Sequence, residues 1–171
     1  NKAIEIDPKY AAAHYNKGVL YDKLLQHEEA IRNLDEAIKC DSGNVNTAFY
    51  RGVVLGKMKK HEEALNCFEN IYRKHPKHMD AFFHKGMELA ELGKHERALE
   101  IFDKLFQIHE GNVNVIYAMA RSNAAMNNVG RALYLLEQAV KKDRKTIKKW
   151  ALEDEFFDSL QDEPKFAKLI K

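Results

Sequence analysis

The strongest constraint on this chain is an internal repeat with a period of about 34 residues. When the sequence is aligned with itself at that offset, small residues fall at equivalent positions in successive segments. They are Gly18, Gly52, Gly86 and Ala120, followed by Ala30, Ala64, Ala98 and Ala132. Large apolar residues align in the same way, namely Leu34, Phe68, Phe102 and Leu136. A fixed period of this length predicts a chain built from one supersecondary unit that stacks on copies of itself.

The segment 79–109 shows what this unit is. Its apolar residues recur at helical spacing in two runs, which are separated by Gly93, Lys94 and His95. Because glycine is the usual residue just beyond a helix C-terminus, the pattern predicts two antiparallel helices joined by a tight turn. Neither helix of such a hairpin buries its apolar face alone, so the next hairpin must cover the open flank.

The pattern resembles the tetratricopeptide repeat (TPR) of the prokaryotic type. That repeat has Gly or Ala at its eighth position, Ala at its twentieth and an aromatic residue or Leu at its twenty-fourth, and the resemblance covers residues 1 to about 146. It implies an all-α fold, a right-handed α-solenoid superhelix of stacked helix–turn–helix hairpins with a C-terminal helical cap. The resemblance is specific for the fold and weak for function, because this fold serves many different partners.

Six segments are expected within this fold. In chain order they are the tail of an upstream TPR (1–10), TPR 1 (11–44), TPR 2 (45–78), TPR 3 (79–112), a degenerate TPR 4 (113–146) and capping helices (147–171). The first is a half-repeat, so we expect the natural protein to continue upstream of Asn1. Asn123 of TPR 4 takes a core position, where an amide is unfavourable unless it is hydrogen-bonded. Thr146 is expected to N-cap the first capping helix.

The candidate binding residues lie on the first helices of the repeats. The fifth position holds Tyr15, Phe49, Phe83 and Tyr117, and the ninth position holds Val19, Val53, Met87 and Arg121. In the TPR family the first helices line the concave face. The resemblance therefore implies an apolar and aromatic groove that binds a helix or an extended segment of a partner. The alternative is that an aromatic residue at the fifth position is common in this repeat and only packs against its neighbours.

One TPR subfamily binds the C-terminal carboxylate of chaperones with Lys and Asn side chains. The matching positions here read Tyr15, Val19, Tyr50, Asp80 and His84, and the register that starts one repeat later does not supply the set either. A carboxylate needs cationic and amide donors. A partner that docks through apolar side chains is therefore favoured.

No other chemistry is indicated by the sequence. His27, His61 and His95 share the seventeenth position, where stacked hairpins would hold them about 8–10 Å apart. That separation is too large for ligands of one metal ion, so we interpret them as turn residues and predict no metal site. No nucleophile motif or Gly-rich phosphate loop is present. We predict that the chain is not an enzyme and needs no cofactor.

The charge and hydropathy patterns exclude several other roles. A net charge of +2 favours no class of partner. The basic run Lys141–Lys149 fits cations at the end of the second helix of TPR 4, so nucleic acid is not expected as a partner. No run of about 18 apolar residues is present, which argues against membrane insertion. Cys40 and Cys67 fit reduced thiols of a cytoplasmic protein.

Together these features predict a non-catalytic scaffold for protein–protein interaction, with a protein or peptide as its partner. Two further functions stay open. One is that of a structural protein that self-associates, and the other is that of the adaptor arm of a larger multidomain enzyme.

Overall fold

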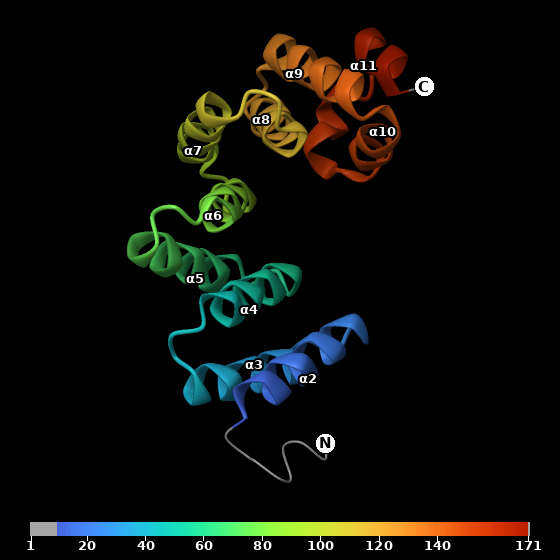
Figure 1. Cartoon of the computed structure of the whole chain (residues 1–171). Helices are drawn as coiled ribbons and strands as arrows, with labels where there is room; N and C mark the ends of the chain where they lie inside the picture. The colour runs from blue at the N-terminus through green and yellow to red at the C-terminus, as the bar shows by residue number, and fades with distance from the viewer. Residues whose placement is uncertain (1–9, 171) are drawn as a thin grey trace. The chain divides into compact units, whose positions relative to one another are not determined.

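The computed structural model describes residues 10–170 of the 171-residue chain. The expected half-repeat at 1–10 therefore lies outside the described residues, except for Tyr10. Within residues 10–170 the backbone is helical, with one short 3-10 helix and no strand. The helices follow one another as hairpins in chain order (Figure 1). No helix in this part of the chain has both the length and the apolar character needed to cross a membrane.

The fold is an α-solenoid of stacked helical hairpins. The first helices of the hairpins are α2 (Ala11–Lys23), α4 (Val45–Lys57), α6 (Met79–Glu91) and α8 (Val113–Ala125). The second helices are α3 (His27–Cys40), α5 (His61–Lys74), α7 (His95–Ile108) and α9 (Val129–Lys142). The C-terminal segment adds α10 (Arg144–Glu153), the 3-10 helix η1 (Glu155–Leu160) and α11 (Pro164–Ile170).

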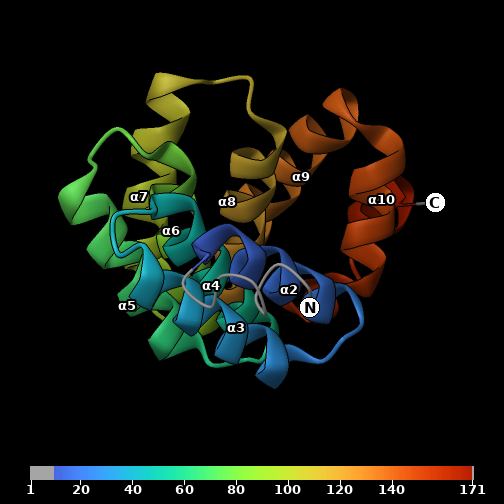
Figure 2. The same ribbon diagram turned by 60° about the horizontal axis from the view of Figure 1, so that its bottom comes forward.

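These helices form two compact units, Asn1–Glu88 and Leu89–Lys171, whose boundary falls within α6. In the first unit α3 packs against α2 and α4, and α4 packs against α5. In the second unit α8 packs against α7, α9 and η1, while α10 and α11 pack against α9 and against each other. Both views show α10 beside α9 (Figures 1 and 2).

The eighth position is glycine in the first two repeats because the two helices of each hairpin approach closely there. A Cβ atom placed on Gly52 would lie 2.8 Å from ring carbons of Phe68, and one on Gly18 would lie 2.8 Å from Cγ of Leu34. Phe68 and Leu34 are fully buried. The large residue of the second helix therefore fills the space that the glycine of the first helix leaves.

The turn inside each hairpin contains one residue in the left-handed backbone region. These residues are Leu25, Lys59, Gly93 and Asn127, with φ values of 59°, 58°, 71° and 58°. The residue after each one donates its N–H to a carbonyl of the first helix, as in the 2.8 Å bond from Lys94 to Leu89. This bond closes the helix end. Gly93 and Asn127 are residue types that often adopt this conformation, whereas Leu25 and Lys59 seldom do, so the sequence does not mark the first two turns.

Two expectations for the C-terminal segment are wrong in detail. The N-cap of α10 is Asp143, whose carboxylate accepts a hydrogen bond from the Thr146 N–H at 3.1 Å. The helix therefore begins at Arg144, since an anionic acceptor suits the positive helix N-terminus better than a hydroxyl does. Consequently only Lys141 and Lys142 of the basic run end α9, and the rest of the run lies in α10.

The buried side-chain amide of Asn123 in TPR 4 forms hydrogen bonds with residues nearby in the chain. Asn123 is 7% exposed, and its Nδ2 donates to the backbone carbonyl of Met119 at 2.8 Å. Its Oδ1 accepts from the Asn128 side chain at 3.5 Å. A polar residue in this core position is therefore compatible with the hairpin.

Candidate binding site

In the first unit, two of the fifth-position rings contact the sixth-position ring of the next repeat. The Tyr15 and Tyr50 rings meet edge to face with centroids 5.9 Å apart, and Phe49 and His84 meet in the same way at 5.2 Å. Phe49 also packs edge-on against the core residue Phe68 at 5.5 Å. Tyr15 and Phe49 are half-buried as a result. Packing between successive first helices therefore accounts for part of their role, as the alternative interpretation predicts.

The ninth-position residues Val19, Val53 and Met87 are also half-buried. Val53 packs against the core that contains Leu55 and Phe68. We define the first-helix face as the half-buried residues of the first unit at both positions. They are Tyr15, Val19, Phe49, Val53, Phe83 and Met87.

His84 lies at the centre of the aromatic contacts that support this face. Its imidazole stacks on Phe68 with centroids 5.1 Å apart, and the Phe83 ring meets it at 5.7 Å. Burial lowers the pKa of His84, and the charge of Asp80 opposes this effect only in part. At neutral pH the ring is therefore neutral and acts as an aromatic side chain.

Acidification should destabilise the first unit through His84. The reference pKa is 6.5, and the pKa in the folded protein is lower. The unfolded chain therefore binds more protons as the pH falls through this range, and the free energy of unfolding decreases. Urea unfolding at about pH 7.5 and about pH 5.5 should show a larger loss for the wild type than for His84→Gln. Equal losses in the two proteins would contradict this assignment.

The two remaining predicted residues, Tyr117 and Arg121, belong to the second unit and are covered by its C-terminal segment. Tyr117 is 7% exposed, and its hydroxyl donates to the Asp154 carboxylate at 2.8 Å. Nε of Arg121 lies 2.6 Å from the same carboxylate, and an Nη atom donates to Glu91 at 2.9 Å. The Arg121 guanidinium also lies 4.3 Å from the centroid of the Phe156 ring. These contacts correct the expectation that Tyr117 and Arg121 line an open groove.

Ion pairs between successive repeats were not evident from the repeat pattern. Nε of Arg51 lies 2.6 Å from Asp35, and Nζ of Lys85 lies 3.1 Å from Glu69. Both pairs join the seventh position of one repeat to the twenty-fifth of the preceding one. The sequence signal that would have revealed them is the shared spacing of two opposite charges.

Two of the histidines that were expected to be only turn residues lie beside buried carboxylates. The Asp22 carboxylate accepts from the Tyr50 hydroxyl and from Lys57, both at 2.6 Å, and lies 3.1 Å from His27 Nδ1. Burial would raise the pKa of Asp22, but the hydrogen bonds and charges of these partners lower it overall. His61 Nδ1 lies 2.8 Å from Glu88.

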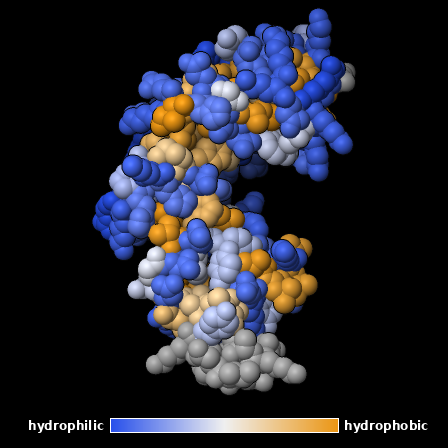
Figure 3. Space-filling view, viewed as in Figure 1, coloured by the Kyte–Doolittle hydropathy of each residue, from blue (hydrophilic) through white to orange (hydrophobic). Residues whose placement is uncertain are grey.

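A separate apolar patch lies at the turn between α2 and α3. Leu20, Leu24 and Leu25 are 55%, 57% and 78% exposed there, and Figure 3 shows an orange area over this turn. The predicted groove did not include these residues, because they occupy other positions of the repeat. Among the residues that the structure describes, no three His, Cys, Asp or Glu side chains gather as metal ligands would.

Comparison with known families identifies the repeat. Tetratricopeptide repeat models match residues 1–32, 51–112 and 89–153. The chain belongs to the tetratricopeptide repeat family. No curated protein sequence matches this TPR chain significantly.

Solved structures of other TPR proteins have the same fold. A fragment of MamA from Desulfovibrio magneticus RS-1 has 16% identity and a TM-score of 0.73, with 94% of this chain and 93% of that chain covered. YrrB, described as a TPR protein with an unusual peptide-binding site, has 20% identity and a TM-score of 0.67, with 98% and 87% covered. A TPR protein from Parabacteroides merdae has 17% identity and a TM-score of 0.82, with 99% and 66% covered. At these identities the likeness shows the fold alone.

Proposed function

We propose that this TPR chain is a scaffold for protein–protein interaction, and that it binds an apolar segment of a partner protein along the first-helix face. The observation that carries the proposal is the recurrence of half-buried apolar side chains at two equivalent positions of three successive first helices. Contacts repeated at a regular spacing suit a partner that presents side chains at regular intervals, as a helix or an extended strand does.

The packing of the first-helix face supports binding as well. Tyr15, Phe49 and Phe83 are held by neighbouring rings in the unbound chain. Side chains that are already ordered lose little conformational entropy when a partner covers them, so more of the burial free energy contributes to affinity. None of the six residues is charged, which favours an apolar ligand surface. The peptide-binding site described for YrrB supports a peptide as the ligand class.

The other functions expected from the sequence stay predictions. They are self-association of the array, a role as the adaptor arm of a larger enzyme, and a cytoplasmic location. The family supports a non-catalytic role, since TPR proteins are typically scaffolds.

Peptides selected from a random display library against this chain should bind the first-helix face. Replacing Val19 with Thr and Met87 with Gln keeps the side-chain shapes but makes two of the six contacts polar. We expect the selected peptides to bind this double variant roughly tenfold more weakly, which is about 1.4 kcal/mol. Fluorescence anisotropy with a labelled peptide measures the change.

The matched control is Leu152→Gln, which makes the same kind of change at a 61% exposed residue outside the face. It should bind like the wild type. Circular dichroism melting of all three proteins checks that folding is retained. Equal affinity of the double variant and the wild type for every selected peptide would refute the proposed site.

A further inference from the structure

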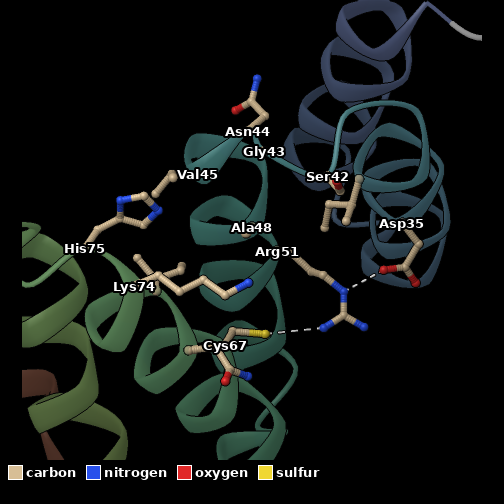
Figure 4. A pocket seen from close by; sticks show the side chains of 13 residues that line it. Asp35, Ser42, Gly43, Asn44, Val45, Ala48, Arg51, Cys67, Lys74 and His75 are labelled. Carbon is tan, nitrogen blue, oxygen red and sulfur yellow. Dashed lines mark hydrogen bonds and ion pairs between the residues drawn. The ribbon is translucent and has the colours of Figure 1, made fainter.

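The first unit contains a cavity of about 550 Å³ between α3, α4 and α5 (Figure 4). Its apolar floor consists of Ile38, Val45, Ala48 and Ile71, and its polar rim includes Asn44, Asn70, Lys74 and His75. On α4 the lining residues Val45, Ala48 and Arg51 follow at intervals of three and so share one side of the helix. None of the six residues of the first-helix face lines this cavity, so it is a different site from that face.

One small residue explains why the space is hollow. At the next repeat, the positions equivalent to Ile38 and Ala48 hold Tyr72 and Phe82. Those two rings stack with centroids 4.3 Å apart and planes inclined by 12°, and they fill the place between α5 and α6. In the cavity the second ring is replaced by the methyl group of Ala48. The repeat therefore has room for an aromatic residue at this position, but the second repeat has Ala48 there.

The rim of the cavity has an excess of positive charge. Asp35 is the one acidic residue among those lining it, and Arg51 pairs with it at 2.6 Å. Arg51 also contacts the Cys67 sulfur at 3.3 Å, so its guanidinium is held at the cavity wall. Lys74 forms no ion pair within the described part of the chain, and Figure 4 shows its side chain extending across the opening. Asn44 and Asn70 also line the cavity, and their side-chain amides carry hydrogen-bond donors.

We propose that this cavity binds an acidic peptide segment of a partner protein. An aliphatic side chain such as leucine lies on the floor of Ile38, Val45, Ala48 and Ile71. A neighbouring glutamate or aspartate of the peptide accepts charge-assisted hydrogen bonds from Lys74 and from the rim amides. The complementarity of charge selects an acidic peptide, and the apolar floor selects an aliphatic residue within it. This proposal stands independently of the first-helix face.

Two short peptides test the proposal by NMR of methyl-labelled full-length chain. The probe is acetyl-Gly-Glu-Leu-Glu-Gly-amide, and the comparison peptide carries lysine in place of both glutamates. The acidic peptide should shift the methyl signals of Ile38, Val45 and Ile71 in a saturable way, and the lysine peptide should not. No shift with the acidic peptide, or equal shifts with both, would overturn the proposal.

Two variants locate the site. Lys74→Glu should weaken binding of the acidic peptide roughly tenfold, whereas Lys104→Glu, the same change on an exposed residue of α7, should not alter it. Ala48→Phe fills the cavity as Phe82 fills the neighbouring space and should abolish binding. If Ala48→Phe fails to fold, the comparison of the two lysine variants decides. Shifts at Val53 with none at Ile38 would overturn this proposal and leave the first-helix face as the binding site.

Discussion

The Arg121→Met variant should lose about 3 kcal/mol of the free energy of unfolding of the second unit. Arg121 and Asp154 form an ion pair whose side chains are only 12% and 11% exposed. The Asp154 carboxylate also accepts from the Tyr117 hydroxyl and from the Phe156 N–H. Without the guanidinium, this carboxylate keeps its place in a poorly hydrated site and loses its cation, which is the costly way to break a buried pair.

Chemical denaturation monitored by circular dichroism measures this loss. Methionine retains most of the length of the arginine stem, so the change reports mainly on charge and hydrogen bonding. The double variant Arg121→Met with Asp154→Asn removes both charges and should recover part of the loss, which a double-mutant cycle quantifies. A single variant as stable as the wild type would show that solvent, rather than Arg121, neutralises Asp154.

This network has a structural consequence for the C-terminal segment. Arg121 and Tyr117 belong to α8, Glu91 ends α6, and Asp154 precedes η1. One arginine therefore joins three elements of the second unit. The network holds the C-terminal segment against α8.

The Phe68→Ala variant should destabilise the first unit by about 3–5 kcal/mol. Phe68 is fully buried and fills the space beside Gly52. It also contacts Phe49 and His84 with ring centroids 5.5 Å and 5.1 Å away. Truncation removes the transfer free energy of the ring and leaves a cavity between helices that are held in place by their neighbours.

The conservative variant Phe68→Leu provides the control, since leucine occupies the equivalent position in the first repeat at Leu34. It should lose clearly less stability than Phe68→Ala in urea unfolding. Because Phe49 rests on Phe68, the alanine variant should also weaken peptide binding at the first-helix face, if it folds under the conditions of the assay. A stability loss below about 1 kcal/mol for Phe68→Ala would mean that the hairpin collapses around the vacant site.

From the sequence, the candidate site could be predicted only where its residues recur with the repeat's period of about 34 residues. The six residues of the first-helix face were predicted from their spacing, which places them at equivalent positions of successive first helices, and their role in binding stays a prediction. Tyr117 and Arg121 follow the same spacing but are covered by Trp150, Asp154 and Phe156. Nothing in the repeat predicts that contact, because the covering residues lie beyond the last repeat.

The sequence by itself determined the α-helical hairpins, their period and the close helix approach at Gly18 and Gly52. These features are set by residues that lie near each other in the chain and recur, so a local pattern records them. Only the tertiary structure decided the burial of Arg121, the carboxylate partners of His27 and His61, and the cavity beside Ala48. Each of these features depends on which side chains come into contact between different helices. The interaction free energy of two such side chains depends on both residues together, so the position of either one in the repeat does not reveal it.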